Sequence, residues 1–187
     1  KAIKKKHGDF ILINTNMGFG NNIRGDDFVF KNYGKRFENI REIVDFDKVK
    51  REVYVELVQA IVNNTKNSVV LRPHPEEDLL WYKRAFNGFE RVKIIYEGSA
   101  IPWLLAAVIM VHPDCTTAIE SLLLGKKSIS YLPFESPEEL ITKPPIDASD
   151  RFNDQDKLVD HLGKGEFIME QFDLTKYPLV EENFCYS

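Results

Sequence analysis

The segment of residues 108–131, VIMVHPDCTTAIESLLLGKKSISY, constrains the fold more than any other part of the chain. It opens with the apolar run 108–111, which is typical of a fully buried parallel strand. A helix is predicted after the next turn, because Thr117 and Glu120 have the spacing of a capping box and a glycine follows the apolar stripe. A second strand, Ser128–Tyr131, follows directly. Strand, helix and strand form a βαβ unit, and its right-handed crossover places both strands parallel in one sheet.

Polar residues follow the first of these strands, at its carboxyl end. In open parallel sheets, ligands bind outside the carboxyl ends of the strands, and a helix N-terminus offers free N–H groups that suit a phosphate. Alternatively, Thr116 and Thr117 only cap the helix and Glu120 only closes the capping box. Asp114 or Thr116 could also cap the helix one turn earlier. The candidate site residues of this segment are His112, Asp114, Thr116, Thr117 and Glu120.

Composition predicts a single cytoplasmic globular domain. The chain has 187 residues, of which 43% are hydrophobic and 29% charged, and these fractions are ordinary for a globular protein with one sizeable core. The net charge of −4 gives no indication of nucleic-acid binding. No apolar run has transmembrane length, no signal peptide is visible, and Cys115 and Cys185 match no metal or redox spacing. Residues 1–9 are expected to be a linker and residues 150–187 terminal helices, within a longer two-domain protein.

Further strands are predicted at Phe10–Asn14, 68–71 and 92–96, so the parallel sheet should have about five or six strands. Residues 26–47 are expected to be irregular with short helical turns, and residues 132–153 a long loop. Helices are predicted over residues 48–64, 78–86, 103–107, 154–162 and 167–172.

A loop rich in glycine and asparagine follows the first strand, at residues 15–22. Glycines let a backbone approach a ligand or another domain closely. The loop lacks the third glycine and the helix of a dinucleotide fingerprint, so a plain connecting loop is the alternative.

The strand at residues 68–71 leads into Arg72-Pro73-His74-Pro75. The flanking prolines restrict the backbone around His74, which favours a ligand-contact role for a side chain with a preset direction. Arg72 could bind a phosphate or form an ion pair with Glu76 or Glu77. Pro75, Gly98 and Ser99 also lie at predicted carboxyl ends of strands. We therefore expect the loops after residues 71, 96 and 111 to converge on one pocket.

Taken in order, these motifs resemble the bacterial surface carbohydrate biosynthesis proteins, and more distantly the capsule Kdo transferases and CDP-glycerol glycerophosphotransferases. The resemblance covers roughly residues 10–131. Its motifs are Arg72-Pro73-His74-Pro75, Glu97-Gly98-Ser99 with Ile101-Pro102-Trp103, His112, Cys115-Thr116-Thr117-Ala118-Ile119-Glu120, and Leu124-Gly125-Lys126.

The resemblance implies a GT-B architecture of two Rossmann-like domains, with this chain as the carboxyl-terminal, donor-binding half. His74 would then contact the donor phosphate or nucleotide, and Glu120 would accept from a ribose hydroxyl. Thr116 and Thr117 would hold phosphate, while Gly98 and Ser99 would line the base pocket. The chain departs from the family at Pro113-Asp114, where Asn or Ser is expected after His112, and this puts a carboxylate beside the supposed phosphate site.

The sequence thus predicts an α/β, Rossmann-like three-layer domain with a parallel sheet. The expected function is donor binding in a metal-independent, cofactor-free glycosyltransferase of surface polysaccharide (capsule or lipopolysaccharide) biosynthesis. The donor would be a nucleotide-activated sugar or polyol, with CMP or CDP favoured. A glycan or lipid-linked acceptor would bind through a missing amino-terminal domain, with peripheral association at the inner face of the membrane. Alternatives are a non-catalytic nucleotide-sugar-binding module and a GT-B-like nucleotide-sugar epimerase.

Overall fold

The computed structural model describes residues 2–165, 167 and 176–180. Its centre is a six-stranded, entirely parallel sheet with the strand order β3-β2-β1-β4-β5-β6. The central strand β1 is buried at every position, as expected for a strand covered on both faces. The strands are β1 (Phe10–Asn14), β2 (Ser68–Arg72), β3 (Val92–Ile94), β4 (Ile109–His112), β5 (Ser128–Tyr131) and β6 (Asp150–Phe152).

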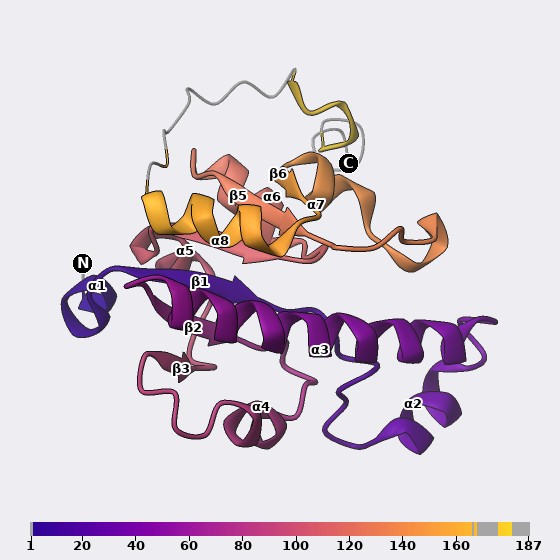
Figure 1. The fold of residues 1–187 in the computed structure, drawn as a ribbon. Helices are drawn as coiled ribbons and strands as arrows, with labels where there is room; N and C mark the ends of the chain where they lie inside the picture. Colours follow the sequence, from indigo (N-terminus) through magenta and orange to yellow (C-terminus); the bar gives the residue numbers. More distant parts are fainter. Residues whose placement is uncertain (1, 166, 168–175, 181–187) are drawn as a thin grey trace.

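Helices cover both faces of the sheet, which confirms the predicted three-layer α/β/α Rossmann-like fold (Figure 1). On one face α3 (Ile40–Asn64), α4 (Leu79–Ala85) and α8 (Gln155–Lys164) bury their apolar residues in the larger core cluster. On the other face lie α1 (Ala2–His7), α5 (Ile101–Ala106) and α6 (Thr117–Leu123). The remaining helical elements are α2 (Asp26–Tyr33), the 3₁₀ turn Glu138–Leu140 and α7 (Lys143–Asp147), which packs on α6.

The region expected to be irregular, residues 26–47, instead forms α2 and the first two turns of α3. Val29 of α2 packs with Ile40 and Val44 of α3 in a small apolar cluster of its own. Helix α3 therefore has 25 residues and runs on beyond the end of β1 (Figure 1). Local sequence alone did not predict this, because the packing partner lies in a separate helix.

Two further segments differ from the sequence-based expectation. Residues 2–7 are helical rather than a linker, and the ring of His7 packs against Trp103 with 5.4 Å between ring centres. Strand β6 lies where a loop and terminal helices were expected. Its three residues are exposed or half-buried at the sheet edge, so the sequence has no apolar run that would indicate a strand there. The predicted helix at residues 167–172 lies outside the described residues, apart from Phe167.

No helix within the described ranges is long and apolar enough to cross a membrane.

Candidate functional site

A cavity of about 250 Å³ opens at the carboxyl ends of β1 to β4. The strands are parallel, so the segments that follow them meet at one edge of the sheet. His74 and Thr117 lie in this single cavity, which confirms that the loops after β2, β3 and β4 converge. Its walls are formed by Asn14, Thr15, Arg72, Pro73, His74, Pro75, Tyr96, Gly98, Ser99, Ala100, Cys115 and Thr117.

Six of the ten candidate residues line the cavity: Arg72, His74, Pro75, Gly98, Ser99 and Thr117. His112 and Asp114 are buried outside it, and Thr116 and Glu120 are exposed on the surface without lining it. The candidates chosen because they follow the carboxyl ends of β2 and β3 therefore lie together in one cavity. Of the candidates around the start of α6, only Thr117 joins them.

The buried carboxylate of Glu77 holds the loops after β1 and β2 together. Its Oε1 accepts from the hydroxyl of Thr15 at 2.8 Å and from the backbone N–H groups of His74 at 3.0 Å and Met17 at 3.1 Å. Its Oε2 accepts from the hydroxyl of Tyr82 at 2.5 Å. Burial raises the pKa of Glu77, and these hydrogen bonds oppose the rise. Glu77 is 1% exposed, so it acts through Thr15 and His74, which line the cavity.

Arg72 holds the turn after β3 instead of pairing with a glutamate. Its guanidinium donates to the backbone oxygens of Glu97 at 2.9 Å and Gly98 at 3.1 Å. The indole of Trp103 donates to the same Glu97 oxygen at 3.0 Å. Burial lowers the pKa of Arg72. Of the two alternatives for Arg72, the ion pair with Glu76 or Glu77 is not formed. The carboxylate of Glu77 accepts from neutral donors, and the guanidinium of Arg72 donates to two backbone carbonyls.

His112, at the end of β4, is fully buried and does not line the cavity. Its Nδ1 accepts from the backbone N–H of Cys115 at 3.1 Å, and its Nε2 lies 2.8 Å from the hydroxyl of Ser149. Burial lowers the pKa of His112 to about 4, so the ring is neutral near pH 7. Both ring nitrogens are occupied, and the ring contributes no charge to the site.

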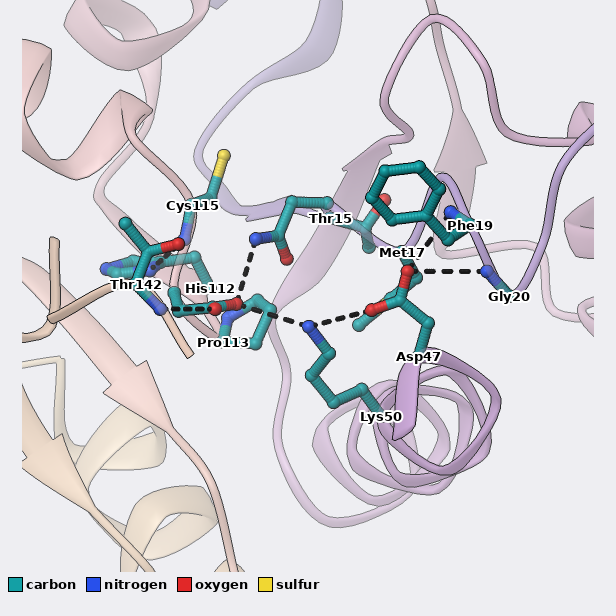
Figure 2. Close-up of polar contacts among 12 residues, drawn as sticks. Thr15, Met17, Phe19, Gly20, Asp47, Lys50, His112, Pro113, Cys115 and Thr142 are labelled. Atoms are coloured by element: carbon teal, nitrogen blue, oxygen red, sulfur yellow. Dashed lines mark hydrogen bonds and ion pairs between the residues drawn. The ribbon is translucent and has the colours of Figure 1, made fainter. Parts of the chain in front are cut away.

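The carboxylate of Asp114 belongs to a buried ionic cluster under the loop after β1. Figure 2 shows Lys50 of this cluster pointing towards Asp47. Lys50 of α3 lies 2.9 Å from Asp47 and 3.4 Å from Asp114. Asp114 also accepts from Asn16 at 2.8 Å and from the backbone of Thr142 at 2.9 Å. The sequence analysis expected this carboxylate beside the phosphate site; in the structure it faces Lys50 and does not line the cavity.

The Gly/Asn-rich loop is held close to α3 by the same cluster. Asp47 accepts from the backbone N–H of Phe19 at 3.1 Å and of Gly20 at 3.3 Å. A Cβ on Gly20 would lie only 2.6 Å from the backbone nitrogen of Lys48, so only glycine permits this approach. At Gly20 the close approach that glycine allows is made to helix α3.

The predicted capping box is not formed, and Thr117 has a different role. Helix α6 starts without a side-chain cap at Thr116. The hydroxyl of Thr117 accepts from the amide of Asn14 at 2.9 Å and donates to the sulfur of Cys115 at 3.1 Å. The end of β1 is thereby joined to the start of α6 at the floor of the cavity.

The cavity thus combines preset loops with a few polar groups and no carboxylate, which suits an anionic or polar ligand. Sequence reasoning missed Asn14, Thr15 and Tyr96, although the strand-end rule applies to each of them. Within the described ranges, no group of three or more His, Cys, Asp or Glu side chains could hold a metal ion.

Three larger cavities of the described residues lie elsewhere. One of about 720 Å³ is lined by residues 64–67 and by α8, before the start of β2 and hence at the opposite edge of the sheet. Another of about 480 Å³ lies beyond β5 and β6. A third of about 350 Å³ is lined by residues 86–90 and by Val92 and Ile94 of β3. None of the three contains a candidate residue from the motifs of the sequence, so the site is assigned by the chemistry of its lining and not by its volume.

No family model matches the chain, and no curated protein matches it. Among solved structures, the fold is similar to that of the UDP-GlcNAc 2-epimerase of Methanocaldococcus jannaschii in complex with UDP-GlcNAc and UDP. The TM-score is 0.51 and the sequence identity is 14%. The match covers 100% of this chain and 48% of that chain, so this chain spans about half the epimerase's length. At this identity the likeness shows the fold alone, that of one half of a GT-B-type enzyme.

Proposed function

We propose that the cavity at the carboxyl ends of β1 to β4 binds the nucleotide of a nucleotide-activated sugar. The observation that carries this proposal is the convergence of His74, Thr117 and the turn at Gly98 on that cavity. Parallel α/β sheets bind nucleotides at this place. The family resemblance of the sequence and the likeness to half of a UDP-GlcNAc 2-epimerase both support a nucleotide-sugar ligand.

His74 is the donor that we assign to the phosphate. Its backbone is restricted by two prolines and bonded to buried Glu77, so its ring direction is set before the ligand arrives. The backbone N–H of Glu76 lies 3.4 Å from the ring Nδ1 and points to it. A neutral ring that accepts at Nδ1 carries its proton on Nε2, which can donate to a phosphate oxygen.

The function that we favour for the whole protein is glycosyl or polyol-phosphate transfer in bacterial surface polysaccharide assembly. This chain would stabilise the leaving nucleotide, since preset donors aimed at a developing charge lower the barrier to transfer. The acceptor, and any contact with a membrane, would involve a second domain. On this proposal the chain alone binds nucleotide but transfers nothing.

A nucleotide-sugar epimerase is the second candidate, and the solved structure with the similar fold favours it. The two candidates differ in their products: a transferase gives free nucleotide and an elongated acceptor, whereas an epimerase gives an isomer of its own substrate. Chromatography of the products formed by the full-length protein from UDP-GlcNAc or a CMP-sugar separates them. A non-catalytic binding module would yield neither product.

A thermal-shift panel of CMP, CDP, UDP and GDP tests the binding proposal. A ligand present at a hundred times its Kd stabilises the native state by about 2.7 kcal/mol. In a chain of this length that corresponds to a rise in Tm of about 5–10 °C. The family resemblance favours a cytidine nucleotide, and the fold likeness favours UDP. If none of the four nucleotides raises Tm at millimolar concentration, the proposed function is wrong.

A further inference from the structure

The ring of Tyr96 stands apart from the other aromatic side chains. Tyr96 is 47% exposed, whereas every other Phe, Tyr and Trp whose burial the structure describes is buried or half-buried. Exposing a large ring to water is unfavourable unless something covers it. Tyr96 also lines the candidate cavity, immediately before the turn at Gly98. An exposed aromatic ring at the rim of a polar cavity is a surface on which a flat ligand can stack.

Side chains from β2 and α5 hold the turn that follows Tyr96. The guanidinium of Arg72 donates to the carbonyls of Glu97 and Gly98, and the indole of Trp103 donates to that of Glu97. The guanidinium carbon of Arg72 lies 5.6 Å from the centre of the Trp103 ring and 5.9 Å from that of Tyr96. Gly98 adopts a φ of 63°, which other residue types rarely tolerate. The backbone that presents Tyr96 is therefore fixed, and the ring is preorganised at the rim.

We infer that Tyr96 is the stacking platform for the base of the bound nucleotide. This inference rests on the proposed function, and it fixes the direction of the ligand: the base lies over the end of β3, and the phosphate lies towards His74 after β2. The two strands are neighbours in the sheet, so a single nucleotide can span both positions. Stacking tolerates either pyrimidine because every base has a flat face.

The test measures the affinity of UDP, CMP and ribose 5-phosphate by calorimetric titration. In Tyr96→Ala, binding of UDP and CMP should weaken about tenfold or more, the scale of base–aromatic stacking. Ribose 5-phosphate has no base, so its binding should stay within about twofold. Tyr96→Phe keeps the ring and should bind UDP within about twofold of wild type. Leu105→Ala is the matched control, since Leu105 is 55% exposed on α5 but does not line the cavity.

Several results would overturn the assignment. If Tyr96→Ala binds UDP like wild type, the ring is not a platform. If it weakens ribose 5-phosphate as much as UDP, the side chain only supports the fold of the turn. If it weakens UDP-GlcNAc but leaves UDP unchanged, the ring contacts the sugar instead of the base. If wild type binds no nucleotide at all, the proposed function fails and this inference fails with it.

Discussion

The carboxylate of Glu77 accepts a hydrogen bond from the backbone N–H of His74 at 3.0 Å, and the same oxygen accepts from the hydroxyl of Thr15 at 2.8 Å. One buried oxygen thus fixes two loops that follow neighbouring strands, and both loops line the candidate cavity. A buried carboxylate that faces neutral donors and no cation is costly unless those donors are all in place. We take Glu77 to be a positioning residue for His74.

Replacing Glu77 by leucine should destabilise the fold and weaken nucleotide binding together. Leucine offers no acceptor to the Thr15 hydroxyl or to the backbone N–H group of His74. We expect a loss of about 1–3 kcal/mol in the free energy of unfolding, the cost of a buried polar group without its partner. Tyr82→Phe is the control, because it removes only the donor to Oε2, on the side of the carboxylate away from the loops. Denaturant unfolding and titration should show both variants destabilised but only Glu77→Leu impaired in nucleotide affinity; equal affinities would make Glu77 purely structural.

Arg72→Lys should loosen the turn after β3. A lysine ammonium cannot reproduce the planar fork that serves the Glu97 and Gly98 carbonyls. We expect about 1–2 kcal/mol of lost stability and weaker nucleotide binding. Arg91 offers a matched control, since it donates to the carbonyls of Thr65 and Asn67 before the start of β2. Arg91→Lys should lower Tm comparably and leave affinity unchanged, and a similar loss of affinity in both variants would rule out a local role for Arg72.

Lys50→Met should be among the most damaging single substitutions in the chain. Lys50 is 2% exposed and faces the carboxylates of Asp47 and Asp114. Burial alone lowers the pKa of Lys50, but these two carboxylates raise it overall. Removing one partner of a buried pair typically costs about 3–5 kcal/mol.

The control for this substitution is Lys48→Met in the same helix. Lys48 pairs with Asp26 in a half-exposed bridge, and such pairs contribute about 0–1 kcal/mol. Chemical denaturation measures both variants. Equal losses would mean that the buried cluster is not a structural centre.

His112 should make stability fall as the pH is lowered. Its pKa is about 4 in the folded chain and about 6.5 unfolded, so the unfolded state binds more protons between these values. The native state is therefore favoured above pH 6.5 and loses about 3 kcal/mol from this group as the pH falls to 4. Denaturation midpoints of wild type and His112→Gln between pH 4 and 7 measure the effect. The variant should lack this component of the slope, and an unchanged slope would contradict the buried, neutral ring.

Much of the fold follows from local sequence, because buried parallel strands are continuous apolar runs. The segments at β1, β2 and β4 contain such runs, and the helical spacing of apolar residues predicted several of the helices between strands. Strand β5 (SISY) has no such run and was predicted as the second strand of the βαβ unit. Strand β6 could not be found, since Asp150 and Arg151 are polar and exposed, and the strand exists only because the edge of β5 pairs with it.

The candidate site shows the same difference between local features, which the sequence indicates, and contacts between distant segments, which it does not. His74, Gly98 and Thr117 were found because position after a strand is a local property. The partners of Arg72, Asp114 and His112 were missed, because each is reached only across the fold: Gly98, Lys50 and Ser149 are 26, 64 and 37 residues away along the chain. Sequence spacing favoured near neighbours, such as Glu76 for Arg72, over these distant partners.

The most direct test of the central claim is the affinity of His74→Ala for the nucleotide that stabilises wild type best in the thermal-shift panel. His161→Ala is the matched control, because His161 lies in α8 against Phe152, away from the cavity. If the cavity binds the phosphate, His74→Ala should weaken the nucleotide by about 1.5–3 kcal/mol, roughly ten- to a hundredfold, while His161→Ala stays within about twofold. Calorimetric titration that finds all three proteins equally tight would contradict the assignment of the phosphate to His74 and of the nucleotide to this edge of the sheet.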